Sequence, residues 1–121
     1  MSAEENKQVA RKYHELNPDD VEEILTPDFV GRHNPPEMGF GPWNRDQHKR
    51  FLTNNRGTMV DTIHQQIAEG DWVATRFTRG GMYKGKQVTI DLMHFKRFEG
   101  GKIAEIWEYW NPQQLEQQLE P

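Results

Sequence analysis

The sequence contains no cysteine, which excludes a disulfide framework, a thiol nucleophile and a zinc–thiolate site. No run of apolar residues is long enough to span a bilayer, and the opening residues, MSAEENKQ, lack the apolar segment of a signal peptide. A formal net charge of -4 gives no basic footprint for nucleic acid. These absences favour a cytoplasmic protein that binds neither nucleic acid nor membrane.

Motifs for metals and phosphates are also missing. The histidines show no HxH or HExxH spacing, and they are dispersed along the chain as His14, His33, His48, His64 and His94. No glycine-rich phosphate loop appears, because the two glycine pairs have the setting of turns. We therefore expect neither a metal nor a cofactor.

Apolar residues make up only 34% of the 121 residues, a low share for a stable monomer. Either the aromatic residues, 11% of the chain, fill the core, or a second subunit covers part of a sheet. The length and the absence of internal repeats predict a single domain over residues 1–121. We expect this domain to form a homodimer.

Helical patterns dominate the first half of the chain. A capping box opens a predicted amphipathic helix over residues 2–16, and N-cap residues open shorter helices over 17–25 and 44–55. Residues 28–30 are expected to form a short extended piece. The loop 35–43 is rich in proline, glycine and apolar residues, and we expect it to fold over the open end of the core or over a ligand.

Period-two alternation dominates the second half. Strands are predicted over 59–68, 72–78, 88–98 and 103–110, and a last helix is predicted over 111–119. The segment Arg79-Gly80-Gly81 is expected to loosen the chain after the second of these strands. Helices followed by antiparallel strands are typical of an α+β fold, here a cone-shaped curved antiparallel sheet wrapped around the N-terminal helices. Such a sheet would leave a pocket between itself and the helices.

The hairpin from Val88 to Trp110 carries the candidate chemistry. Each of its arms places one titratable side chain, His94 or Glu108, within an otherwise apolar row, and facing positions of a hairpin can bring such groups together. Desolvation would raise the pKa of Glu108, so that the carboxylate could remove a proton next to a carbonyl while His94 donates to the enolate oxygen. The alternatives are a purely structural buried pair and an outward-facing strand.

Other side chains are candidates for substrate binding. Arg76 could orient a substrate, or it could form an ion pair with Asp91 or Glu105. Tyr13 and Trp43 could stack on a flat ligand, or they could simply fill the core.

Three further candidates complete the predicted binding set. His33 could close the pocket mouth or lie on a surface loop, and His64 points either into the site or towards solvent. Trp110 shares the alternating row of Glu108 and could line the pocket. The neighbouring Asn111 is explained by a helix N-cap alone.

Several segments resemble SnoaL-like polyketide cyclases. The segment IAEGDWVATR at 67–76 is similar to the family hairpin "aEGDxVaxR", and FKRFEGGKIAEIWE at 95–108 is similar to "fRfxdGKIvExWD". Residues 6–13, 25–30 with His33, and 114–119 also resemble the family. The resemblance implies the cone-shaped α+β fold shared with nuclear transport factor, ketosteroid isomerases and scytalone dehydratase.

The resemblance also implies a function. In the characterised cyclases, an acid on the last long strand acts as acid/base in an intramolecular aldol closure, assisted by a histidine on the preceding strand; the matching residues are Glu108 and His94. Glu108 stands where the family has Asp, Asn111 stands where many members have Asp, and the loop at 84–86 is shorter. The implied activity is cofactor-independent acid/base chemistry on a hydrophobic carbonyl substrate.

Two other functions stay open. The first is an isomerase or dehydratase of the ketosteroid isomerase type. The second is a non-catalytic domain that binds a small ligand, dimerises or binds a protein partner. An interaction surface would expose Phe77, Met93 and Phe95 on one sheet face, most simply as a homodimer interface.

Overall fold

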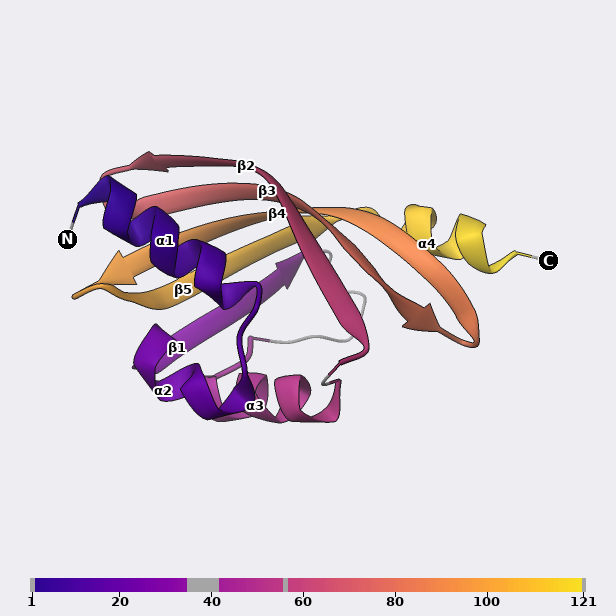
Figure 1. Ribbon diagram of the computed structural model, residues 1–121, viewed down its shortest axis with the longest axis horizontal. Helices are drawn as coiled ribbons and strands as arrows, with labels where there is room; N and C mark the ends of the chain where they lie inside the picture. Colours follow the sequence, from indigo (N-terminus) through magenta and orange to yellow (C-terminus); the bar gives the residue numbers. More distant parts are fainter. Residues whose placement is uncertain (1, 35–41, 56, 121) are drawn as a thin grey trace.

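The computed structural model describes residues 2–34, 42–55 and 57–120. Its centre is a curved, unclosed sheet of five strands in the order β1-β5-β4-β3-β2 (Figure 1). The strands are β1 (Leu25–Asn34), β2 (Met59–Glu69), β3 (Trp72–Tyr83), β4 (Lys86–Glu99) and β5 (Lys102–Trp110). The α+β expectation is thereby confirmed. β2 to β5 form antiparallel pairs in chain order, and β1 joins the free edge of β5 in parallel.

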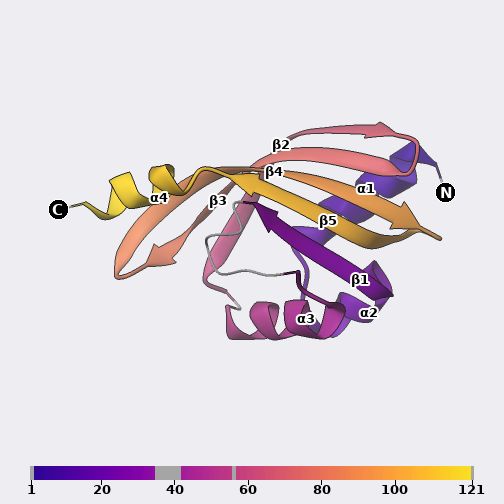
Figure 2. The same ribbon diagram turned by 180° about the vertical axis from the view of Figure 1, so that it is seen from behind.

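The helices lie at three places around the sheet. They are α1 (Ala3–Tyr13), the 3₁₀ turn η1 (Pro18–Asp20), α2 (Val21–Ile24), α3 (Arg45–Asn54) and α4 (Pro112–Leu119). In Figures 1 and 2, α1 crosses one face of the sheet, and α2 and α3 lie beside β1. α4 lies at the end of the molecule that is farthest from the N-terminus. No helix among the described residues is long and apolar enough to cross a membrane.

The predicted helix starts are confirmed by their caps. Ser2 and Glu5 form a reciprocal capping box at α1, and Asn44 and Gln47 form another at α3. The side chain of Asn111 accepts a hydrogen bond from the backbone N–H of Gln113, so this residue is the N-cap of α4. Local side-chain chemistry therefore fixes where these helices begin.

Two strands differ from the prediction. The short extended piece expected at 28–30 is part of the ten-residue strand β1, whose parallel pairing with β5 comes from a distant part of the chain. The strand expected to end at Thr78 continues through the glycines to Tyr83. Position 81 favours glycine, because the Cβ atom of any other residue would lie only 2.7 Å from the backbone oxygen of Thr58 and would clash with it. Most of the predicted loop 35–43 lies outside the described residues.

The sheet has an inner face, which α1 and α3 cover, and an outer face. Alternation along β4 was predicted correctly, with Val88, Leu92, His94 and Phe98 buried on the inner face. The expectation that Phe77 could lie on an exposed face is wrong, because this side chain is fully buried. Large apolar side chains are exposed on the outer face at Met93, Phe95 and Tyr109, and others are exposed at Val60, Ile67, Trp72, Met82 and Tyr83.

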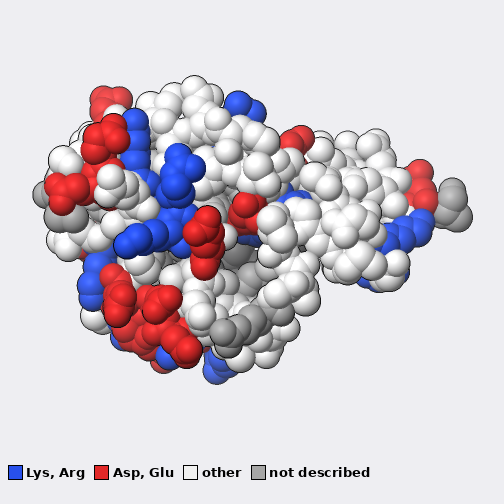
Figure 3. Space-filling view, viewed as in Figure 1, with Lys and Arg blue, Asp and Glu red and all other residues white. Residues whose placement is uncertain are grey.

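The apolar core occupies one end of the inner face. It joins α1, α2, β1 and the turn end of the β4–β5 hairpin, and its buried members are Ala10, Tyr13, Val21, Ile24, Leu25, Phe29, Val73, Phe98, Ile103 and Ile106. Charged side chains lie mainly outside: Figure 3 shows acidic groups gathered near α2 and basic groups near α1. The exceptions to this distribution are buried further along the inner face.

Candidate functional site

Glu108 is held by histidines from both neighbouring strands. His94 on β4 lies directly opposite Glu108 on β5, and its Nε2 is 2.9 Å from Oε1 of the carboxylate. His33 on β1 is in parallel register with Glu108, and its Nδ1 is 2.9 Å from Oε2. Both carboxylate oxygens therefore have an imidazole partner. The predicted contact between Glu108 and His94 is present.

Arg79 connects this carboxylate to a second one. Its Nη1 lies 3.6 Å from Oε1 of Glu108. Its Nε and Nη2 donate to Oδ1 and Oδ2 of Asp61, at 2.7 and 3.1 Å. Asp61 on β2 and Arg79 on β3 are direct cross-strand neighbours, so the sheet itself sets this fork-like contact.

Two further titratable side chains lie behind Asp61. Nδ1 of His14 is 2.8 Å from Oδ2 of Asp61, and Nε2 of the same ring is 2.9 Å from Nζ of Lys96. The Lys96 amine also donates to the hydroxyl of Thr75, at 3.3 Å. Because an imidazole that donates from Nδ1 accepts at Nε2, this arrangement fixes the tautomer of His14.

The expected rise in the pKa of Glu108 is not found. Burial by itself would raise that pKa, but hydrogen bonds from His33 and His94 and the charge of Arg79 together hold it well below its ordinary value. Burial and the nearby Lys96 lower the pKa of His94, which therefore acts as a neutral donor. Glu108 is an ionised acceptor at neutral pH, and not a protonated acid.

The carboxylate of Asp61 behaves in the same way. Burial by itself would raise its pKa, but the bonds from His14 and Arg79 outweigh burial and lower the pKa to about 2. Burial and Lys96 lower the pKa of His14 to about 4, and burial lowers the pKa of Lys96 itself. The inner face thus holds two ionised carboxylates on either side of one guanidinium.

Two cavities adjoin these groups. A void of about 10 Å³ is lined by Glu108, His94 and His33 together with Tyr13, Phe29, Gly31, Arg32, His48 and Ile106. A larger cavity of about 300 Å³ lies against Asp61 and Arg79, between the sheet, the end of α1 and α3. Tyr13 and His48 line both spaces. The larger cavity has the minimum volume typical of small-molecule sites.

Three of the predicted substrate-binding residues are near this centre. The hydroxyl of Tyr13 lies 3.0 Å from Nε2 of His48, and its ring faces His94. The ring centres of His33 and Trp43 are 4.7 Å apart, and backbone bonds of 2.8 Å tie Trp43 to Gly31 of β1. Tyr13 and His33 thus line the void beside Glu108, and Trp43 packs against His33.

The other three predicted substrate-binding residues, Arg76, His64 and Trp110, line neither of these two cavities. Arg76 and His64 are exposed on the outer face, and His64 contacts the hydroxyl of Thr78 there. Arg76 and Trp110 line an open groove of about 610 Å³ beside β4 that shares no lining residue with the two cavities described above. Arg76 is three residues from Arg79 on one strand, so alternation places the two arginines on opposite faces.

Sequence reasoning missed Asp61, Arg79, His14, His48 and Lys96. Lys96 lies two residues after His94, so alternation along the strand would have predicted that its side chain is buried. It was missed because lysine is rarely fully buried and is usually assigned to the surface. Arg79 was hidden by the assumption that the strand ended before it. Among the described residues, no group of three or more histidine or acidic side chains is arranged to hold a metal ion.

Comparison with known structures places the fold. IdmH of Streptomyces antibioticus, a candidate polyketide cyclase, matches with a TM-score of 0.78 at 20% identity, over 94% of this chain and 97% of that one. TerC co-crystallised with polyporic acid matches with 0.79 at 20%, over 97% and 99%. An epoxide hydrolase from M. tuberculosis matches with 0.80 at 18%, over 97% and 90%. At these identities the likeness establishes the fold alone.

The family of the chain follows from a comparison of its sequence with family models. The chain has the α+β fold of nuclear transport factor-like proteins, with a polar centre on the inner sheet face. The family model for SnoaL-like polyketide cyclases matches residues 6–119, so the chain belongs to this family. A search of curated proteins found no match. Family and fold support a function of the cyclase or isomerase type.

Proposed function

We propose that the protein is a cofactor-independent enzyme that moves protons on a hydrophobic carbonyl substrate, with intramolecular aldol closure as its first candidate reaction. The observation that carries this proposal is the Glu108 carboxylate, ionised, 12% exposed and fixed by imidazoles at both oxygens. A carboxylate fixed in this way has the geometry to remove a proton next to a carbonyl, and its lowered pKa makes it a weaker base than an ordinary glutamate.

The roles follow from the contacts. Glu108 would be the general base, with lone pairs left after each oxygen accepts one hydrogen bond. His94 would act as its positioning residue, because the single N–H of the neutral ring is directed at Glu108. Tyr13, His33 and Trp43 would line the substrate. Tyr13 stays protonated because burial raises its pKa, so its hydroxyl can donate.

Isomerisation or dehydration would use the same groups and is the second candidate chemistry. A non-catalytic role is favoured by one observation: the void beside Glu108 is only about 10 Å³. This volume holds about one water molecule. A substrate would have to reach Glu108 from the larger cavity, past Tyr13 and His48.

The test is proton exchange. Bicyclic ketones, including 1-tetralone and 2-hydroxy-1-tetralone, would be incubated with the protein in D₂O, and exchange next to the carbonyl followed by NMR. Glu108→Gln should lower the rate at least ~100-fold, as expected for loss of a general base. Glu105→Gln is the matched control, because Glu105 lies on the same strand with its ion pairs to Arg32 and Arg97. Exchange that survives Glu108→Gln would refute the assignment.

We further propose that the single domain 1–121 acts as a homodimer in the cytoplasm. The support for dimerisation is the outer face, where Met93 is 43%, Phe95 40% and Tyr109 40% exposed in one chain. The absence of cysteine suits a reducing compartment. Sedimentation at several concentrations tests the dimer, and a monomer at every concentration would contradict it.

A further inference from the structure

The wall of the larger cavity presents an acceptor beside a donor. Asp61 receives hydrogen bonds from His14 and Arg79 but is an acceptor with about four lone-pair sites, so capacity remains. Arg79 has five N–H groups, of which two donate to Asp61 and a third faces Glu108. The side chains of Asp61 and Arg79 are 7% and 18% exposed, and both line the cavity.

This acceptor is fixed from behind. His14, whose side chain is 1% exposed, holds Asp61, and the fully buried Lys96 holds the far nitrogen of His14. The buried amine has an imidazole and a hydroxyl as its hydrogen-bond partners. Burying a lysine against neutral groups is costly, and here it locks the orientation of a cavity-facing carboxylate.

The rest of the lining restricts the ligand. Leu16, Phe51, Leu52 and Met59 supply apolar surface. Among the described lining residues, two carboxylates, Glu15 and Asp61, stand against one guanidinium, which disfavours an anionic ligand. His14 and His48 add no positive charge at neutral pH, since burial lowers the pKa of each to about 4. A volume of about 300 Å³ suits a molecule of one or two rings.

We propose that this cavity binds a neutral ligand of one or two rings that carries a hydroxyl group beside a carbonyl, with Asp61 accepting from the hydroxyl and Arg79 donating to the carbonyl. This inference rests on the proposed function, since it names the substrate class and binding residues for the same centre. It places the reacting carbon near Arg79, the residue that links the cavity to Glu108. His14 and Lys96 are positioning residues.

Binding of three matched probes tests the proposal. These are 2-hydroxy-1-tetralone, 1-tetralone, which lacks the hydroxyl, and 1,2,3,4-tetrahydro-2-naphthol, which lacks the carbonyl. Titration calorimetry or NMR would measure each Kd with the full-length protein. A hydrogen bond to a charged group corresponds to roughly a tenfold or greater change in Kd, so the hydroxyketone should bind at least ~10-fold more tightly than either analogue.

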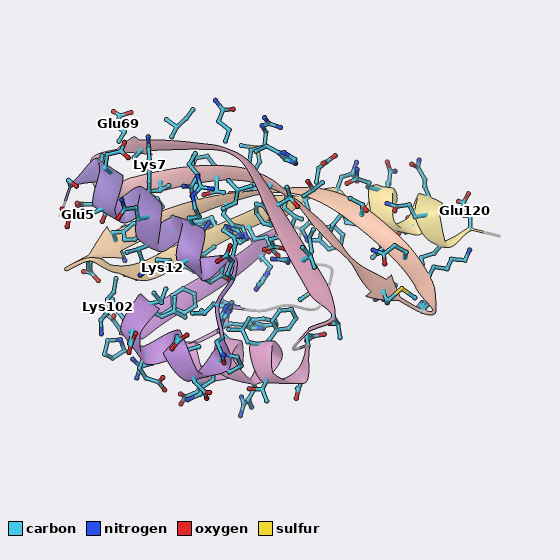
Figure 4. The ribbon with its side chains drawn as sticks, viewed as in Figure 1. Glu5, Lys7, Lys12, Glu69, Lys102 and Glu120 are labelled. Carbon is cyan, nitrogen blue, oxygen red and sulfur yellow. The ribbon has the colours of Figure 1, made fainter. Side chains whose placement is uncertain are left out.

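Protein variants locate the preference. Asp61→Asn should reduce the preference for the hydroxyl while keeping the preference for the carbonyl. Lys96→Met should weaken the hydroxyl preference through His14, and ¹⁵N shifts of His14 would report the altered ring. The matched control is Glu69→Gln. Glu69 lies on β2, as Asp61 does, but it is exposed at the edge of the molecule (Figure 4), so this variant should bind the probes like the wild type.

The outcomes separate this inference from the proposed function. Equal affinity for the three probes, or binding to none of them, would overturn the inference without relying on any variant. A hydroxyl preference that Asp61→Asn leaves unchanged would also overturn it. If the hydroxyketone binds as expected but no proton exchange depends on Glu108, the binding site stands and the proposed chemistry fails.

Discussion

On the inner face of the sheet charged and imidazole side chains are buried, whereas on the outer face large apolar side chains are exposed. His94 and Lys96 are 1% and 0% exposed, while their neighbours Met93 and Phe95 are 43% and 40% exposed on the same strand. The stability of the fold alone would favour the opposite arrangement, with charged side chains exposed and apolar side chains buried. Burying charge costs free energy, and exposing apolar surface gains none. This difference is the basis of the two proposals made above, a ligand on the inner face and a second subunit on the outer face.

The largest expected effect comes from acid. His14 and His48 each have a pKa of about 4 in the folded protein, against about 6.5 in the unfolded chain. The unfolded state therefore binds more protons below pH 6.5, and stability falls as the pH is lowered towards 4. Each histidine should account for about 3 kcal/mol of the loss in the free energy of unfolding.

Urea unfolding between pH 7 and pH 4 measures this loss. His48→Gln should remove about a third of the pH dependence, because the pKa of the buried His94 is lowered as well as those of His14 and His48, while His64→Gln, at an exposed outer-face histidine, should leave it intact. A stability that stays constant over this range would mean that the inner histidines are not buried in neutral form.

The next effect compares two arginines on β3. Arg79→Met leaves Asp61 and Glu108 buried without their shared cation, and should cost about 3–5 kcal/mol at pH 7. Arg76→Met, on the outer face, should change the free energy of unfolding by no more than about 0.5 kcal/mol. Chemical denaturation of both variants measures the contrast. Similar losses for the two would contradict the assignment of faces.

A pair of phenylalanines sharpens the comparison. Phe77→Ala should cost about 3–5 kcal/mol, because Phe77 is fully buried against the inner groups. Phe95→Ala should cost about 1 kcal/mol in a monomer, because much of its surface already faces solvent. A much larger cost that depends on protein concentration would show that a second subunit covers the outer face.

The smallest effect is expected at Lys96. Replacing this buried amine with methionine of similar length relieves desolvation and leaves His14 and Thr75 with one partner fewer. These contributions oppose each other, so Lys96→Met should stay within about 1 kcal/mol of the wild type in urea unfolding at pH 7. A loss as large as that of Arg79→Met would mean that Lys96 serves the fold rather than the site.

Sequence reasoning succeeded where the structure is local. The turn at Gly100-Gly101, where both residues adopt positive φ, pairs Glu99 with Lys102 as the sequence predicts, whereas a register shift of one residue next to Arg97 is needed to bring His94 opposite Glu108. Caps likewise placed the helix starts. Such features depend on neighbours along the chain, and their patterns are visible without tertiary structure.

The rest of the centre is non-local. His33 reaches Glu108 only because β1 joins the sheet in parallel, and His14 reaches Asp61 only because α1 crosses the inner face. The direction of the Glu108 pKa shift was mispredicted for the same reason: burial was visible in the pattern, but the donors that outweigh it come from distant segments. Pattern reasoning predicted the contact between Glu108 and His94 and missed the other residues around this carboxylate.

The central claim is that Glu108 is an ionised base held by His33, His94 and Arg79. Its most direct test is a ¹³C NMR titration of the Glu108 carboxyl group in the wild type and in Arg79→Met. The wild-type pKa should lie well below the ordinary glutamate value, and the variant should raise it, because one neighbouring positive charge is lost. A wild-type pKa at or above the ordinary value would contradict the account, since the carboxyl would then be a solvated or protonated group.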